Sequence, residues 1–374
     1  MRLMRLIGLM RPMRLIGLIG LMGLMGCSKD EEEQLSTVSS IEVMSYVAGF
    51  EENTFATRSW VPPTPYVPYD EADKAIGIAF TKNDEDPKLG HFFTSSGKWR
   101  TNIDNIEPKT YYLYGYVPHF GGISMSITKR DVPNANYSEG AKVTLSNVPA
   151  VMPSDLCVVI GAKAGTGKET VEGLRRGDFA YKGSASAEGN YVFLLLDHLY
   201  AALRIRMRVH DDYAALRTIK LKSLSLKTYA GATTSSQKTN IMVDLKATDV
   251  SNPDENPIQD ITYTPSGGEI TEPLEFWSSE SEELTTDFKP FVGHFMPDGI
   301  TTLVLTSVYD VYDKQRNLIR KDCKATNTMV LSELLTKQET TRRGSRYTIN
   351  MTIKPTYLYM LSEPDLNNPT VTVE

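Results

Sequence analysis

The stretch Ala202 to His210, with the sequence ALRIRMRVH, decides the fold class of this chain. Arginines alternate strictly with the apolar residues Leu203, Ile205, Met207 and Val209. Because successive side chains of a β-strand point to opposite faces of the sheet, this period of two predicts a strand with one buried face and one face in water. The same alternation recurs near the end of the chain, at Tyr347, Ile349, Met351 and Ile353.

Other segments also favour β-structure. Tyr111 to Val117 and Leu303 to Tyr312 are rich in β-branched and aromatic residues. Between Ile219 and Leu226 the apolar alternation changes phase, which predicts a β-bulge near Ser223. Helix signals are confined to two short segments, residues 211–217 and 332–337.

Turn-forming residues separate the strands at short intervals, at Gly121-Gly122, Pro149, Ser266 to Gly268, Pro297 to Gly299 and Asp313 to Asn317. Such spacing favours β-sandwiches over α/β folds. The chain has 374 residues, which is enough for two domains. We therefore predict an all-β fold of two tandem β-sandwich domains, residues 36–187 and 188–374, that meet in the small and polar segment Gly183 to Gly189.

The chain begins with a basic and apolar leader that ends at a cysteine. Its uncharged run, Leu15 to Gly26, is about half the ~20 residues that a membrane-spanning helix needs. Leu24, Met25 and Gly26 before Cys27 resemble the lipobox of bacterial lipoproteins, although Met25 departs from the usual small residue. We predict that residues 1–26 are a cleaved signal peptide and that Cys27 is lipidated; the alternative is an ordinary signal peptide followed by an incidental cysteine.

Acidic residues follow the predicted anchor directly, from Asp30 to Glu33. By charge alone, residues 27–35 form a solvated tether. The acidic run also resembles the signal that sends lipoproteins to the outer face of the outer membrane in some Gram-negative bacteria. Each buried methylene of an acyl chain contributes ~0.8 kcal/mol, so several chains make the anchor permanent. We expect a lipoprotein of the outer membrane, exposed at the cell surface.

Charge and cysteine content exclude some functions. The formal net charge is −6, and the leader to be removed is basic, so nucleic acid is a poor partner. Cys157 and Cys323 are the only cysteines besides Cys27, and their wide separation gives no disulfide framework. The sequence favours two free thiols.

Residues that resemble catalytic or cofactor-binding motifs do not have the spacing that those motifs require. Gly161 to Glu169 resembles a phosphate-binding loop, but Ala162 stands where the first glycine should be, and Glu169 stands where a hydroxyl should bind magnesium. Five histidines are scattered without metal-ligand spacing: His91, His119, His198, His210 and His294. We expect His198 to be a buried, hydrogen-bonded histidine rather than a catalyst. The sequence predicts no enzyme, no cofactor and no metal.

A family resemblance arises from several stretches in order behind the lipobox: Tyr111 to Pro118, Leu196 to Val209, Thr301 to Asp313, Arg342 to Ile353 and Pro355 to Pro369. Together they resemble the fimbrillin-like lipoproteins, the subunits of type V pili, over nearly the whole mature chain. The resemblance implies two transthyretin-like β-sandwich domains, in agreement with the strand pattern.

The resemblance also implies an assembly mechanism. In that family a protease cuts after an arginine near the start of the first domain, the severed N-terminal strand leaves, and a strand of the next subunit fills the groove. Here Ile41 to Val47 corresponds to the strand, and the bond between Arg58 and Ser59 to the cut, with Arg100 as a weaker rival. The favoured donor strand is Thr356 to Glu374; the alternative is that this tail closes its own domain.

Two functions remain open. The first is a fimbrial subunit of the shaft, tip or anchor, or a fimbrium-associated lipoprotein, with other fimbrial subunits, the outer membrane and an adhesion ligand as partners. The second is a surface lipoprotein that does not polymerise and binds glycan or host protein through its loops. Its candidate stacking residues are Tyr66, Tyr69, Trp99 and Trp277. A third hypothesis, a surface hydrolase, is not supported, because the sequence contains no hydrolase motif.

Overall fold

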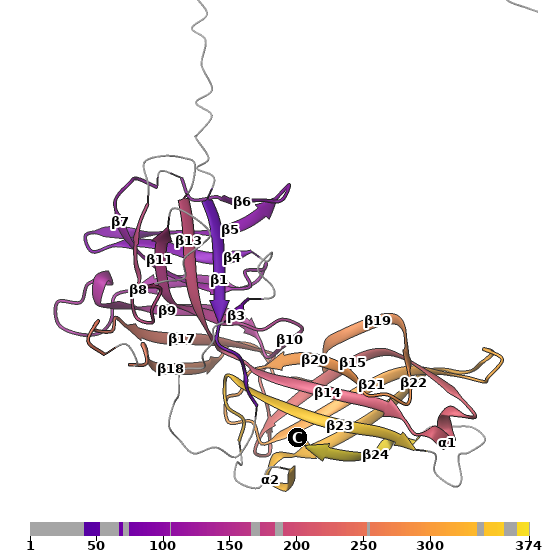
Figure 1. Ribbon diagram of the computed structural model, residues 1–374. Coiled ribbons are helices and arrows are strands. Elements are labelled where there is room, and N and C mark those ends of the chain that lie inside the picture. Colours follow the sequence, from indigo (N-terminus) through magenta and orange to yellow (C-terminus); the bar gives the residue numbers. More distant parts are fainter. Residues whose placement is uncertain are drawn as a thin grey trace, which may run out of the picture. The chain divides into compact units, whose positions relative to one another are not determined.

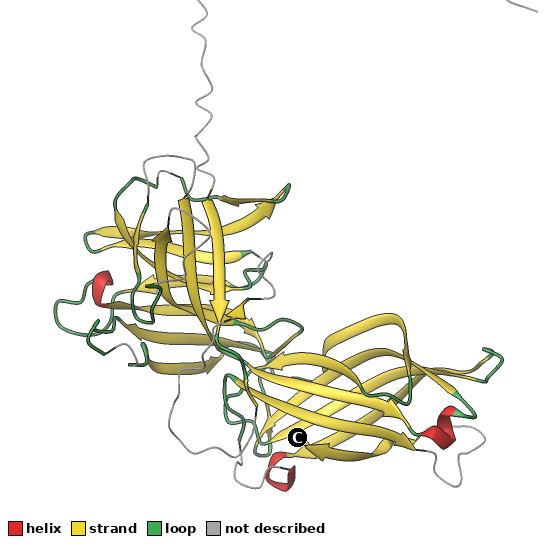
Figure 2. Cartoon of the chain, viewed as in Figure 1, coloured by secondary structure: helices red, strands yellow, loops and turns green. Residues whose placement is uncertain are grey.

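A computed structural model describes residues 41–52, 67–69, 75–104, 106–165, 173–183, 190–252, 255–334, 340–354 and 365–373. Figures 1 and 2 show that strands dominate these residues. Helices in the described residues are single turns at Tyr137–Glu139 (η1), Asp211–Ala214 (α1) and Leu331–Leu334 (α2). The predicted all-β fold is confirmed. None of the helices in the described part of the chain has the length and hydrophobicity of a membrane span.

Two sheets form the first sandwich. In the described residues, the larger sheet has nine strands in the order β3-β1-β13-β11-β7-β4-β5-β6, with β12 beside β7. Their bounds are Ile41–Val47 (β1), Val67–Pro68 (β3), Ile76–Lys82 (β4), Glu85–Ser95 (β5), Lys98–Thr101 (β6), Thr110–Val117 (β7), Cys157–Gly165 (β11), Ala180–Lys182 (β12) and Asn190–His198 (β13).

The smaller sheet of this sandwich has the order β18-β17-β9-β8. Its strands are Ser124–Thr128 (β8), Gly140–Pro149 (β9), Lys238–Lys246 (β17) and Ile258–Pro265 (β18). Leu145 and Val243 from this sheet pack with Val158 and Leu195 from the larger one, and all four are fully buried. Burial of this apolar surface joins the two sheets.

The nine-stranded sheet buries apolar side chains on its other face as well. Ile78, Leu113, Val159 and Leu194 belong to a second cluster that includes Phe92 of β5 and residues of β1. Because β1 contacts β6 as well as β13, the sheet curls until its two ends enclose this cluster. Burial on both faces explains why β4 and β13 are continuous apolar runs instead of alternating ones. We call this cluster the curl core.

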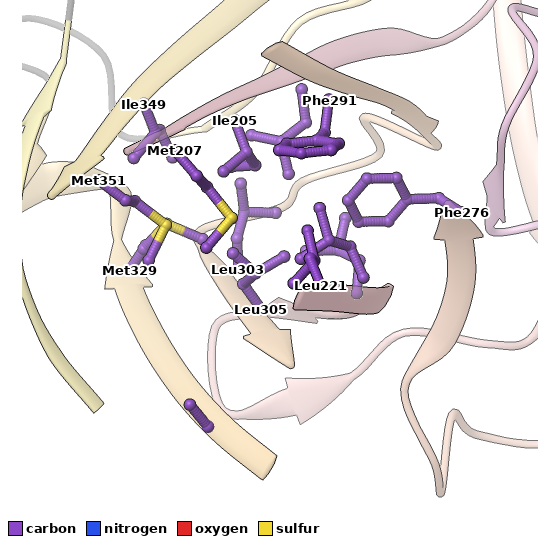
Figure 3. Packing of buried hydrophobic residues seen from close by; sticks show 14 of the residues in the cluster. Ile205, Met207, Leu221, Phe276, Phe291, Leu303, Leu305, Met329, Ile349 and Met351 are labelled. Atoms are coloured by element: carbon purple, nitrogen blue, oxygen red, sulfur yellow. The ribbon is translucent and has the colours of Figure 1, made fainter. Parts of the chain in front are cut away.

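Two further sheets form the second sandwich. One has the order β10-β20-β14-β23-β2, with β24 beside β23, and the other the order β16-β15-β21-β22, with β19 beside β15. The bounds are Glu51–Glu52 (β2), Val151–Met152 (β10), Ala201–Val209 (β14), Thr218–Ala230 (β15), Thr233–Thr234 (β16), Leu274–Leu284 (β19), Lys289–Phe295 (β20), Thr302–Tyr312 (β21), Leu318–Val330 (β22), Ser345–Lys354 (β23) and Asp365–Val373 (β24). Figure 3 shows Ile205 and Met207 of β14 pointing toward Leu221, Leu303 and Leu305 of the facing sheet.

The local strand predictions are confirmed. In β14 the apolar residues are buried and the arginines are half-buried, and Arg204 Nε donates a hydrogen bond to Thr348 Oγ1 at 2.9 Å. The register of β15 shifts between Leu221 and Ser223 against both of its long neighbours, which is the bulge expected from the change of phase.

Sheet membership does not follow chain order. Strands β13, β17 and β18 lie in the predicted C-terminal segment 188–374, yet they pair with strands of segment 36–187: β13 with β1 and β11, and β17 with β9. Conversely, β2 and β10 from the first segment pair with β23 and β20. The domain boundary at residues 187 and 188 stays a prediction, because strand pairing does not say which segments fold independently.

The core in Figure 3 gives a stability prediction. Leu303→Ala removes a fully buried side chain and should lower the free energy of unfolding by about 2–5 kcal/mol. Leu318→Ala is the control, because Leu318 is 49% exposed and should change it by less than about 0.5 kcal/mol. Denaturant titration measures both, and equal losses would contradict the assigned core.

Candidate functional site

Strand β1 lies near the edge of the nine-stranded sheet and is held on one side only along its full length. All seven residues pair in parallel with β13, from Ile41 opposite Asn190 to Val47 opposite Leu196. On its other side, within the described residues, β1 pairs in a ladder only with the two residues of β3, although it also lies close to β6. Tyr69, just after β3, donates its backbone N–H to Ser45 O at 3.0 Å. Departure of β1 would therefore leave the pairing of β13 with β11 in place (Figure 1).

The inward face of β1 covers the curl core with small side chains. Val43, Ser45 and Val47 are buried, whereas the alternate residues are half-buried. Beside them on β13 lie Val192, Leu194 and Leu196, which are also buried in the curl core. A serine thus occupies the middle of an apolar groove, so β1 fills this groove with less apolar surface than a strand with three aliphatic side chains would.

The chain that leaves β1, Ala48 to Phe50, is held by His198 at the end of β13; we call these three residues the exit segment. His198 Nε2 lies 2.7 Å from Ala48 O. The ring of Phe50 stacks on the His198 ring with a centroid distance of 3.9 Å. The guanidinium of Arg346 also lies over the Phe50 ring, 5.1 Å from its centroid. One histidine therefore contacts both the backbone and a side chain of the exit segment.

His198 belongs to a buried cluster with Asp155 and Cys157. Its Nδ1 lies 2.6 Å from Asp155 Oδ2, and Cys157 Sγ lies 3.1 Å from the same oxygen and 3.7 Å from Nδ1. The backbone brings them together, because Cys157 of β11 and His198 of β13 are paired residues of one antiparallel ladder. All three are at least nine-tenths buried. Asp197, the residue before His198 in β13, forms an ion pair with Arg343 at 3.0 Å.

The charges around His198 favour its protonated form. Burial alone would lower its pKa, but the Asp155 carboxylate, through charge and hydrogen bonding, and the Asp197 carboxylate outweigh burial, so the pKa of His198 is raised. With both ring nitrogens protonated, Nδ1 donates to Asp155 and Nε2 donates to Ala48 O. The thiol of Cys157 donates to Asp155 as well.

This arrangement does not match a thiol nucleophile, although cysteine, histidine and aspartate are all present. A catalytic histidine must accept the thiol proton on a free ring nitrogen. Here both ring nitrogens of His198 are engaged with acceptors, and the thiol points to a carboxylate instead. The cluster is also covered, since Cys157 has no exposed surface.

A cavity of about 230 Å³ adjoins the cluster and the exit segment. Its lining includes Ala48, Phe50, Asp155, His198 and His294. Within the described residues, Asp155 Oδ1 is a buried oxygen with no hydrogen-bond partner. The lining therefore combines apolar residues, such as Ala48 and Phe50, with Asp155, whose carboxylate has one unsatisfied oxygen.

The structure describes some of the residues singled out from the sequence and leaves others outside its described ranges. Cys27, Arg58, Ser59 and Tyr66 lie outside the described residues, as do residues 27–35. Arg100 lies within β6, paired opposite Phe93. Both remaining cysteines are free thiols, and the expected buried, hydrogen-bonded state of His198 is confirmed.

The candidate stacking aromatics pack into cores. Tyr69 is buried in the curl core and donates its hydroxyl to Asp155 O at 2.9 Å, and Trp99 packs against the same core. Trp277 packs edge-on against Phe291 with a centroid distance of 4.7 Å. These three side chains are therefore engaged within the protein. Sequence reasoning missed Asp155, which has no signal until β11 and β13 pair.

The described residues define an all-β protein of tandem sandwiches, with the parallel strand β1 next to the edge strand β3 of its sheet. No protein-family model and no curated protein matches the chain. Among solved structures it is similar to a fimbrial protein from Bacteroides vulgatus, at 14% identity and a TM-score of 0.38, over 90% of this chain and 97% of that one. It is also similar to the fimbrial anchor protein Mfa2 from Porphyromonas gingivalis, at 10% identity and a TM-score of 0.22, over 88% and 95%.

Both of these neighbours are fimbrial proteins by name. At these identities and TM-scores the likeness carries no argument about function.

The burial pattern of β1 gives a prediction. Val43→Asp places a carboxylate against the curl core, where an unsatisfied polar group costs about 1–3 kcal/mol, so the β1 amides should exchange hydrogen at least about fivefold faster. Met44→Asp is the matched control on the half-buried face. Hydrogen exchange with mass spectrometry compares the two, and equal protection in both variants would show that the inward face is assigned incorrectly.

Proposed function

We propose that this chain is a cell-surface fimbrial subunit or fimbrium-associated lipoprotein that joins its neighbour by strand exchange and supports adhesion. The observation that supports this proposal is the position of β1. It covers a hydrophobic groove, but among the described strands only β13 pairs with it over its full length. Such a strand can be replaced without rebuilding the sheet.

Loss of β1 would leave the edge of β13 open to pairing with a strand of another subunit. The open edge of β13 would present unpaired backbone groups beside the exposed curl core, and such an edge pairs readily with another chain. Each replaced backbone hydrogen bond contributes about 0.5–1.5 kcal/mol net. A donor with an aliphatic residue at the position of Ser45 would add the burial of a side chain, about 1.5–3 kcal/mol. The exchanged joint would then hold more tightly than β1 itself.

The proposed cut between Arg58 and Ser59 fits this exchange by its place in the chain. It lies between β2 and β3, so cleavage there separates β1 from the rest of the first sandwich. The same cut also frees the body from Cys27. Arg100 is a poorer substrate, because it lies within β6, paired with β5, and cleavage there would require the hairpin to open.

The C-terminal tail is the proposed donor. Its strand β24 pairs antiparallel with β23, from Val373 opposite Ile349 to Asp365 opposite Lys354. In this arrangement the tail closes its own sheet, which corresponds to the alternative prediction that the tail completes its own domain. As a donor it must first leave β23, and its position at the rim of that sheet lets it do so without breaking other strand pairs.

The lipid anchor completes the proposal. Lipidation at Cys27 would hold the precursor at the outer membrane, with residues 27–35 as an acidic tether, until the cut releases it for assembly. A lipoprotein that does not polymerise and binds glycan remains the alternative, but its aromatic candidates Tyr69, Trp99 and Trp277 pack into cores.

Cleavage at Arg58 is testable by limited trypsin treatment of the full chain. The wild type should lose β1 and form multimers that resist mild SDS, and Arg58→Ala should reduce multimers at least about tenfold, because β1 stays covalently joined. Arg100→Ala is the matched control and should assemble like the wild type. Multimers from Arg58→Ala in wild-type amount would remove Arg58 as the processing site.

Lipidation is testable by metabolic labelling with palmitate. The wild type and Cys323→Ser should incorporate the label, whereas Cys27→Ser should incorporate none and leave the membrane fraction, since the thiol that follows the lipobox is gone and Cys157 and Cys323 lie outside that motif. Label retained in Cys27→Ser would contradict the predicted anchor.

A further inference from the structure

We propose that Asp155, Cys157 and His198 form a binding site for a divalent transition-metal ion of the zinc class. The three side chains offer a carboxylate oxygen, a thiolate sulfur and an imidazole nitrogen, which are the donor types of protein zinc sites. These ligand atoms all lie within 4.8 Å of one another. The cluster arises only in the fold, because 41 residues of sequence separate Cys157 from His198.

The spacing of the ligand atoms suits a small tetrahedral ion. Bonds of about 2.0–2.3 Å place neighbouring ligand atoms of a tetrahedron roughly 3.3–3.8 Å apart. Cys157 Sγ and His198 Nδ1 are already 3.7 Å apart, fixed by paired positions of β11 and β13. Asp155 Oδ2 is closer to both, at 3.1 and 2.6 Å, so rotation of this one carboxylate completes the spacing.

The surroundings of His198 are those of a metal ligand. A metal-bound histidine donates its other ring N–H to a carbonyl or carboxylate, which fixes the tautomer and the ring orientation. His198 Nε2 donates to Ala48 O at 2.7 Å, so Nδ1 faces the cluster. The stacked ring of Phe50 further limits rotation of the imidazole.

The cavity beside the cluster has room for a fourth ligand of the metal ion. Asp155 and His198 line the cavity of about 230 Å³, which can admit a water molecule, and Asp155 Oδ1 is a buried oxygen without a hydrogen-bond partner in the described residues. With three protein ligands and one solvent ligand the coordination sphere is complete.

Charge balance permits the exchange of protons for an ion. A divalent cation replaces the proton of the Cys157 thiol and the proton on His198 Nδ1, and both protons pass to solvent. The cluster therefore keeps its net charge in a buried place, where an uncompensated charge would be costly.

The test is titration of the full chain, stripped with EDTA and dialysed, with zinc chloride in a calorimeter. The wild type should bind one equivalent, and Cys157→Ser should bind more than about 100-fold more weakly, because loss even of a partner beyond the ligands costs about 10–100-fold. Two controls should bind like the wild type: Cys323→Ser, which removes the other described thiol, and His91→Ala, which disrupts the stacked pair with His119.

Cobalt spectroscopy on the wild type keeps the test independent of variant folding. Cobalt(II) bound by Cys157 should show a thiolate charge-transfer band and the intense visible bands of tetrahedral coordination, and zinc should displace both. The proposal is overturned if the folded wild type binds no zinc, if bound cobalt shows no thiolate band, or if His91→Ala abolishes binding.

Discussion

The parallel ladder between β1 and β13 is the contact on which the first sandwich depends. Strand β13 is buried on both faces, so an unpaired edge there would leave backbone groups unsatisfied beside the curl core. β1 satisfies that edge and covers the core at once. Its two valines and one serine do so with little apolar surface, which makes the strand necessary to the fold and yet replaceable by another.

The end of β13 links this ladder to the buried cluster. His198 is the last residue of the strand whose preceding residues pair with β1, and it also contacts Ala48 and Phe50 of the exit segment. Whatever fixes the His198 ring therefore acts on the chain where it leaves β1. The Asp155 carboxylate is the main such group, at 2.6 Å from Nδ1.

Local structure was predictable from the sequence, and long-range pairing was not. The alternation around Ile205 and the change of phase at Ser223 report a period of two, which depends only on neighbouring residues. The pairing of β17 with β9 joins segments about 100 residues apart, and that of β1 with β13 joins segments about 150 residues apart, for which no local pattern exists. The cluster shares this limit: His198 was recognised as a buried histidine, but its contact with Asp155 requires β11 and β13 to pair.

The most direct measurement is a reversible tether between β1 and β13. Glu42 and Tyr191 are paired, half-buried residues of adjacent strands, so Glu42→Cys with Tyr191→Cys should form a disulfide without disturbing the curl core. After trypsin cleavage, the oxidised variant should remain monomeric and should form multimers once a reductant breaks the tether. Equal multimer formation by the oxidised and reduced variant would contradict the claim that β1 must leave for subunits to join.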